Sequence, residues 1–76
     1  MKKLKKILAK VLEVKESSIT DKTSSENVLS WDSFNTLMII SEIETVFNTK
    51  LTIQEAVNVK SVKDIKDILK NHGVVL

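Results

Sequence analysis

The chain has 76 residues, no cysteine and a formal net charge of +2. This length fits one domain and is near the lower limit at which a hydrophobic core alone holds a fold, and without cysteine neither a disulfide nor a thiolate zinc site adds stability. No apolar run approaches the roughly 20 residues of a membrane-spanning helix, so we expect a single soluble domain over residues 1–76 with no membrane insertion.

Lysines are concentrated at the start of the chain. Five of them occupy the first ten residues, which contain no acid, whereas ten acids outnumber seven lysines in the remainder. A nucleic-acid-binding arm would be expected to carry Arg or aromatic residues among the lysines, and none is present. Lys10 and Glu13 also interrupt the apolar run that a signal peptide needs. We therefore interpret the lysines as a solvated helix face, and expect a cytoplasmic protein with no nucleic-acid partner.

The first predicted element is an amphipathic helix over residues 2–14. Its apolar residues recur at the spacing of one helical face: Leu4, Ile7, Leu8, Val11 and Leu12. Residues 15–32 are mostly polar, with four apolar anchors: Ile19, Val28, Leu29 and Trp31. A loop of this length in so small a domain is usually functional or pinned by such anchors.

The longest predicted helix covers residues 34–47, which include no Gly or Pro, and Asp32 is its candidate N-cap. This helix has two apolar faces. At about 100° per residue, one stripe is expected to face the core: Ile39, Ile40, Ile43, Val46 and Phe47. The opposite side carries three large apolar residues near the start of the helix: Phe34, Leu37 and Met38.

These three outward residues have two explanations. They pack beneath the long polar loop, or they stay exposed and bind a partner protein. Glu42 and Glu44 lie on the same helix and favour a partner with a basic surface.

Two shorter helices complete the chain. Thr52 and Glu55 match a capping box, which predicts a short third helix up to about residue 57. Ser61 begins a fourth helix in a similar way, and Gly73 marks its C-terminal stop. The predicted fold class is therefore all-α, a small four-helix bundle with a long first loop and a short third helix.

Ser33 is one of eight serines, and its place at the start of the longest helix distinguishes it. It should be exposed, and the backbone N–H groups of a helix N-terminus favour a bound or attached phosphate. A hydrolytic nucleophile would need a base, but the only histidine, His72, is near the other end of the chain. Paired carboxylates, Gly-rich phosphate loops and metal-ligand clusters are also missing. Ser33 is thus predicted to be a substrate of another enzyme.

The sequence Asp32-Ser33-Phe34, followed by an apolar helix and two capped helices, resembles the acyl carrier proteins over nearly the whole chain. The resemblance implies that Ser33 receives 4′-phosphopantetheine from coenzyme A, transferred by a phosphopantetheinyl transferase that uses Mg²⁺. It also implies that Asp32 assists the transfer complex. The chain would then be a carrier and not an enzyme, holding an acyl or aminoacyl group as a thioester on the attached arm.

The resemblance also implies a set of partners. These are the transferase, an acyl- or aminoacyl-loading synthetase and downstream transferases, which would act on a monomeric carrier. Their expected docking surface combines the outward apolar residues with the two acids of the same helix: Phe34, Leu37, Met38, Glu42 and Glu44.

Some positions depart from the family pattern. Phe34 stands where Leu is usual, and Asn35 and Met38 stand where carriers of fatty acid synthesis tend to have acids. These departures place housekeeping fatty acid synthesis in doubt. The Trp31-Asp32-Ser33 form is more similar to that of stand-alone carriers, which serve polysaccharide modification or specialised metabolite pathways.

Two other classes of function compete with the carrier. One is a helical protein-interaction module with no prosthetic group, in which Asp32 and Ser33 only cap a helix. The other is a nucleic-acid-binding helical domain that uses the N-terminal lysines. Only a carrier gains one phosphopantetheine when it is co-expressed with a phosphopantetheinyl transferase, so an intact-mass measurement separates the three.

Overall fold

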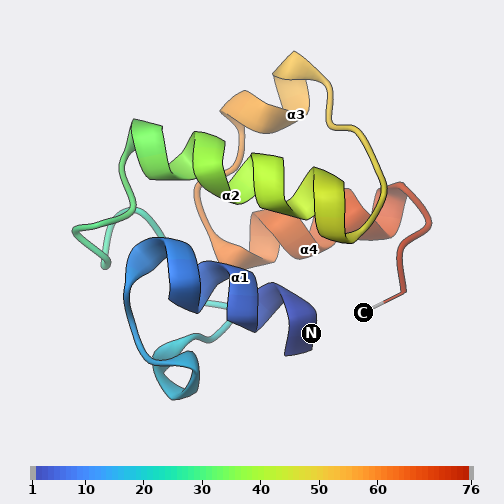
Figure 1. The fold of residues 1–76 in the computed structure, drawn as a ribbon. Helices are drawn as coiled ribbons and strands as arrows, with labels where there is room; N and C mark the ends of the chain where they lie inside the picture. Colours follow the sequence, from blue (N-terminus) through green and yellow to red (C-terminus); the bar gives the residue numbers. More distant parts are fainter. Residues whose placement is uncertain (1, 76) are drawn as a thin grey trace.

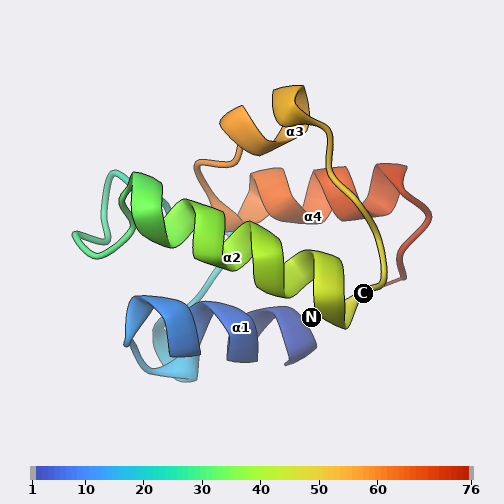
Figure 2. The same cartoon turned by 45° about the horizontal axis from the view of Figure 1, so that its top comes forward.

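The computed structural model describes residues 2–75. Its elements in chain order are α1 (Lys2–Leu12), the 3₁₀ turn η1 (Glu16–Ser18), α2 (Ser33–Val46), α3 (Ile53–Val57) and α4 (Val62–Asn71). In both views α1 and α3 lie on opposite sides of α2, and α1 runs antiparallel to α2 (Figures 1 and 2). Apart from one isolated bridge, residues 2–75 form no β-structure, which confirms the predicted all-α fold. The predicted domain over residues 1–76 extends one residue beyond this region at each end.

The predicted N-caps are present. The Asp32 Oδ1 atom accepts a hydrogen bond from the backbone N–H of Asn35 at 2.8 Å, which fixes the start of α2. Thr52 and Glu55 form the reciprocal capping box that begins α3, and Ser61 caps α4. Each cap satisfies a backbone N–H that has no partner inside its own helix.

Residues in the left-handed region follow three of the helices. They have φ angles of 56°, 50° and 80° at Glu13, Asn48 and Gly73, respectively. The N–H of the next residue returns in each case to a carbonyl in the last turn of the helix: Val14 to Ala9, Thr49 to Glu44 and Val74 to Leu69. Because Glu13 adopts this conformation, α1 ends before the predicted residue 14.

Backbone hydrogen bonds fix the long first loop to the connection between α3 and α4. The Val62 N–H donates to the Thr23 carbonyl and the Ser25 N–H donates to the Lys60 carbonyl, each at 2.9 Å. Thr23 is buried at this junction. The loop is therefore held across the fold by a segment far away in the sequence.

The apolar anchors of this loop divide into two groups. Ile19 and Trp31 are buried in the core, and Val28 packs against it. Leu29 is fully exposed, so its prediction as an anchor is wrong. It lies in a stretch of turns just before Trp31, where the chain bends away from the core.

The core draws on α1, α2, α4 and the loops. Its buried members form one cluster: Leu4, Ile7, Leu8, Leu12, Ile19, Trp31, Ile39, Ile43, Val59, Val62, Ile65 and Leu69. Ile40 is also buried, and Phe47 is half-buried against the cluster. Val46 is 40% exposed, so its prediction as a core residue is wrong. It lies beside Ile7 and the lysines of α1, and because Lys3, Lys6 and Lys10 are exposed, this flank of α2 stays open to solvent.

No helix within residues 2–75 has both the length and the apolar character needed to cross a membrane.

Candidate functional site

Ser33 is the first residue of α2, and it is exposed. Side-chain hydrogen bonds hold the backbone just before it in place. The Ser30 hydroxyl donates to the Leu12 carbonyl at 2.8 Å, and the Asn35 side-chain amide donates to the Ser30 carbonyl at 2.7 Å. The serine is therefore presented at a fixed helix start, close to the C-terminal end of α1.

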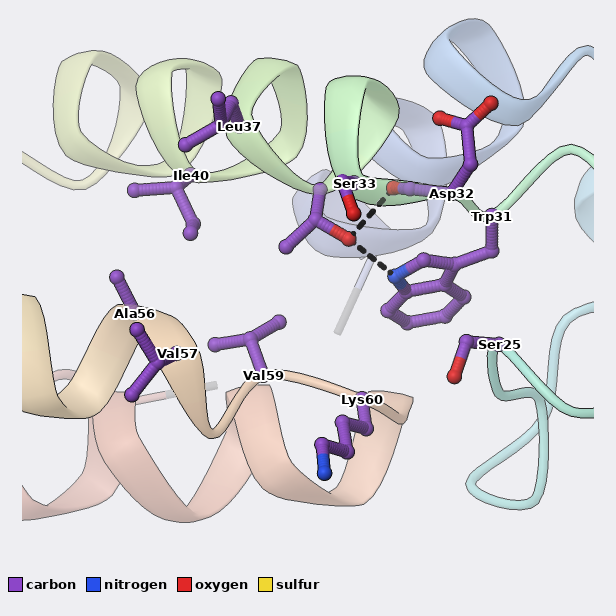
Figure 3. A pocket seen from close by; sticks show the side chains of 11 residues that line it. Ser25, Trp31, Asp32, Ser33, Leu37, Ile40, Ala56, Val57, Val59 and Lys60 are labelled. Carbon is purple, nitrogen blue, oxygen red and sulfur yellow. Dashed lines mark hydrogen bonds between the residues drawn. The ribbon is translucent and has the colours of Figure 1, made fainter.

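Trp31 is buried beside this helix start, with 3% of its surface exposed. Its indole N–H donates to the Thr36 hydroxyl at 3.0 Å, and that hydroxyl donates to the Asp32 carbonyl at 2.8 Å (Figure 3). A buried indole N–H needs such a partner, so these two bonds stabilise the position of the ring. The site prediction did not include Trp31, although an apolar aromatic next to Asp32 and Ser33 is a signal that could have suggested it.

A groove of about 530 Å³ opens beside Ser33 between α2 and α3 (Figure 3). Its walls are mainly apolar: Trp31, Leu37, Ile40, Ala56, Val57 and Val59. Ser25 and Lys60 add polar groups at the end near Trp31 (Figure 3). The groove was not predicted, because its two walls come from segments separated in the sequence and no local pattern indicates that they meet.

The outward apolar residues of α2 are exposed. Phe34 is 70%, Leu37 64% and Met38 43% exposed. Of the two explanations, packing beneath the long loop is therefore wrong. Leu37 faces the groove, and all three residues lie within about one and a half turns of Ser33.

The two acids of α2 have partners within the chain. The Glu42 carboxylate accepts a hydrogen bond from the Lys10 ammonium at 3.1 Å. The Glu44 carboxylate accepts one from the backbone N–H of Leu51 at 2.9 Å. Asp32 also has a partner, since it accepts the capping bond from the Asn35 N–H, but it is exposed and its carboxylate points away from the groove (Figure 3).

Among residues 2–75, no histidine lines the groove at Ser33. His72 caps the end of α4, with its Nε2 atom 2.8 Å from the Glu55 carboxylate and its Nδ1 atom 3.1 Å from the Thr49 hydroxyl. Neither His72 nor these two partners line the groove at Ser33. Within residues 2–75, no group of His, Cys, Asp or Glu side chains could hold a metal ion. The site therefore presents an exposed serine hydroxyl without the histidine that commonly activates such a nucleophile.

A small helical bundle with an exposed serine at a helix N-terminus, an apolar groove beside it and, among residues 2–75, no histidine at that groove has the properties of a carrier domain. Comparison with known proteins agrees, since the family described as "Phosphopantetheine attachment site" matches residues 2–69.

Two similar proteins are acyl carrier proteins. One, from Buchnera aphidicola, is 38% identical over 71 residues, which cover 93% of this chain and 91% of that protein. The other, from Lactobacillus acidophilus, is 33% identical over 70 residues, which cover 92% of this chain and 88% of that protein. The chain belongs to the acyl carrier protein family. It is a carrier and not an enzyme, and its prosthetic group is 4′-phosphopantetheine, contrary to the alternative of an interaction module with no prosthetic group.

Proposed function

We propose that Ser33 is the residue to which 4′-phosphopantetheine is attached, and that the chain presents an acyl or aminoacyl thioester on this arm to partner enzymes. The observation that carries the proposal is the exposed Ser33 hydroxyl at the capped start of α2, at the mouth of an apolar groove. The first-turn N–H groups of a helix favour a phosphate at this position. When bound, the group supplies the thiol, which the chain lacks because it has no cysteine.

Asp32 is proposed to assist the transfer of the group to Ser33. One of its oxygens caps α2, while the carboxylate as a whole is exposed and points toward solvent (Figure 3). A transferase and its Mg²⁺ can therefore reach this negative charge without disturbing the helix start, since carboxylate oxygens are ligands that Mg²⁺ prefers.

The groove between α2 and α3 is proposed to hold the arm or its load. Its apolar walls begin next to Ser33, so a chain attached there can enter without crossing open solvent. Burying apolar carbon in such walls is favourable. Lys60 and Ser25 at one end supply the polar groups that an amide-containing arm requires.

Phe34, Leu37 and Met38 are proposed to dock the enzymes that act at Ser33. A partner that reaches the serine must cover these side chains, and burying large apolar residues at an interface is a major source of binding energy. Exposed on the free protein, they add little to folding. Glu42 and Glu44 lie further along α2 and complete the expected docking surface.

The partners of the carrier are proposed to be a phosphopantetheinyl transferase, an acyl- or aminoacyl-loading synthetase and downstream transferases. The carrier is proposed to act as a cytoplasmic monomer in polysaccharide modification or a specialised metabolite pathway. The absence of acids at Asn35 and Met38 supports this over housekeeping fatty acid synthesis.

The first prediction tests the attachment site. The chain is co-expressed with a phosphopantetheinyl transferase, and its intact mass should rise by one phosphopantetheine. Ser33→Ala should abolish the mass increase while helicity measured by circular dichroism stays nearly unchanged, since Asp32 still caps α2. Ser25→Ala, in the same groove, is the matched control and should be modified normally. Peptide mapping of the added mass to another serine would contradict the proposal.

A further inference from the structure

A second groove, of about 330 Å³, lies on the other flank of α2, between α2 and α1. Three lysines of α1, spaced at i, i+3 and i+7 on one side of the helix, form its rim. The lining is Lys3, Lys6, Ile7, Lys10, Glu42 and Val46. This groove combines positive charge with an apolar floor.

The second groove is continuous with the proposed docking surface. Met38, Glu42 and Val46 follow one another at i, i+4 spacing along α2, so they share one stripe of the helix. Met38 and Val46 are 43% and 40% exposed. A partner that binds along α2 from Ser33 therefore meets this groove next.

The charge of this surface is positive on balance. Lys10 forms a 3.1 Å ion pair with Glu42, and Glu44, which accepts a hydrogen bond from the backbone N–H of Leu51, does not line the groove. Lys3 and Lys6 are exposed and form no salt bridge among residues 2–75. The expectation of a basic partner rested on the two acids of α2, but in this groove three lysines outnumber the single acid, Glu42.

Folding does not explain Lys3 and Lys6 of α1. The N-terminus of a helix carries partial positive charge, which disfavours cations in the first turn, and α1 has no acid there. Lys6 also lies at i, i+3 from Lys3 and at i, i+4 from Lys10, where like charges repel. Lys3 and Lys6 therefore reduce the stability of α1, whereas Lys10 lies in its last turn, where a cation is favourable. Recognition of a negative surface accounts for Lys3 and Lys6 better than folding does.

We propose that enzymes acting at Ser33 dock across α1 and α2 with an acidic protein surface, whose carboxylates contact Lys3, Lys6 and Lys10 while its apolar side chains cover Val46. This inference rests on the proposed carrier function, which brings the partner to the serine. The proposed partner surface is acidic, whereas the acids of α2 alone led to the expectation of a basic one.

The structure favours a protein over other negative partners. The apolar face of α1 is buried in the core, with Leu4 and Leu8 fully inaccessible, so α1 cannot lay that face into a lipid surface. The chain has no Arg and no aromatic residue among these lysines, which disfavours a nucleic acid. A charged rim around an apolar centre is the usual composition of a protein interface.

The experiment uses the full chain, isotopically labelled, and a helical peptide with glutamates along one face and leucines beside them. In an NMR titration, the amide shifts should concentrate at α1 and at Val46, and binding should weaken as salt is added. A peptide with lysines in place of the glutamates is the matched control and should not bind. Anionic phosphatidylglycerol vesicles and duplex DNA are titrated in parallel.

Charge variants give the decisive comparison. The double variant Lys3→Glu/Lys6→Glu should weaken binding of the glutamate peptide about tenfold, because attraction is replaced by repulsion. Glu42→Gln frees Lys10 and should tighten binding about threefold. Lys70→Glu on α4 changes the net charge by the same amount as each single lysine reversal, and should leave the affinity unchanged.

Several results would overturn the proposal. They are preference for the lysine peptide, weaker binding after Glu42→Gln, shifts confined to other surfaces, or tighter binding of the vesicles or DNA than of the glutamate peptide. The mass measurement on Ser33 tests the carrier function separately from the acidic partner. A chain that gains phosphopantetheine but fails these tests keeps the carrier function and loses only the acidic partner.

Discussion

Asp32 combines two properties that a single substitution can separate. Its carboxylate caps α2 through the Asn35 N–H, and its charge is exposed next to Ser33. Asp32→Asn should keep the cap, since Asn is as good an N-cap as Asp, and should leave the melting temperature within a degree or two. The rate of phosphopantetheine attachment should nevertheless fall at least about tenfold, because a charged group near the transferred phosphate and its Mg²⁺ is lost.

The control for this second prediction is Asp32→Ala, which removes the cap as well and should cost about 1 kcal/mol of stability. Attachment rates are measured by mass spectrometry at equal concentrations of folded protein. If Asp32→Asn is modified at the normal rate, the carboxylate only caps the helix.

Single residues of the loop show where prediction from sequence stops. The N-cap at Asp32 and the place of Ser33 in the first turn of α2 were predictable, because caps and helix starts are local patterns. The burial of Trp31 and the exposure of Leu29 depend on the path of the loop, which bonds such as Thr23 to Val62 impose from a distant segment. The periodicity of the sequence does not indicate which distant segment the loop pairs with.

Within the helix α2, neighbouring residues differ in how deeply they are buried. Ile43 is fully buried, whereas Val46, one turn further, is 40% exposed. Our third prediction is that Ile43→Ala costs about 2–5 kcal/mol, which approaches the whole stability of a domain this small. Phe47→Ala should cost less stability than the same substitution of a fully buried Phe, because Phe47 is only half-buried.

Val46→Ala is the matched control and should change stability by less than about 0.5 kcal/mol, as exposed positions usually do. Urea unfolding followed by circular dichroism measures all three variants. Equal losses for Ile43→Ala and Val46→Ala would show that the inner and outer faces of α2 are assigned incorrectly.

The helices themselves were predictable because their signals are local. Asp32, Thr52 and Ser61 cap the helices as predicted, and the periodicity of α1 identifies the face that packs. The end of α1 was placed too late because Glu13, and not a glycine, adopts the left-handed conformation. Val46 was assigned to the core because helical angles on α2 do not show that the side of α1 next to this position carries mainly exposed lysines.

The short helix α3 depends on an acid that should make the fold sensitive to low pH. The Thr52 N–H bond, and then His72, hold the pKa of the Glu55 carboxyl below its ordinary value of 4.5. A lowered folded pKa means that the unfolded chain binds the proton more readily. The stabilisation by the Glu55 carboxylate is therefore complete above about pH 4.5, and it is lost as the pH falls through the folded pKa of Glu55.

The fourth prediction is that Glu55→Gln reduces the fall in melting temperature below this pH, because the amide oxygen still accepts the capping bond but no longer titrates there. Melting curves between neutral and acidic pH measure the effect. Glu16→Gln, at an exposed acid in η1, is the control and should retain the acid dependence of the original chain. An unchanged pH profile in Glu55→Gln would rule out this carboxylate as the source.

Across the whole molecule, α2 is the shared wall of two unlike grooves. The groove toward α3 is apolar and begins at Ser33, and the groove toward α1 is bordered by lysines. The proposed load and the proposed acidic partner would therefore occupy opposite flanks of α2, with Leu37 as the one proposed docking residue that also lines the groove at Ser33.

The fifth prediction follows from the apolar groove. Attaching an octanoyl group to the arm should raise the melting temperature above that of the acetyl form, because each buried methylene contributes about 0.8 kcal/mol. The emission of Trp31, the only tryptophan, should change as well, since its ring forms part of the groove wall. Ala56→Phe places a ring in the groove and should abolish both differences.

Gln54→Phe is the matched control, because Gln54 is an exposed residue of the same helix that does not line the groove. It should preserve the difference between the octanoyl and acetyl forms. The unloaded Ala56→Phe and Gln54→Phe chains are melted first, so that a loss of folding is distinguished from a filled groove. If octanoyl and acetyl carriers melt alike and Trp31 emission does not change, the load extends into solvent, and α2 and α3 enclose neither the arm nor its acyl group.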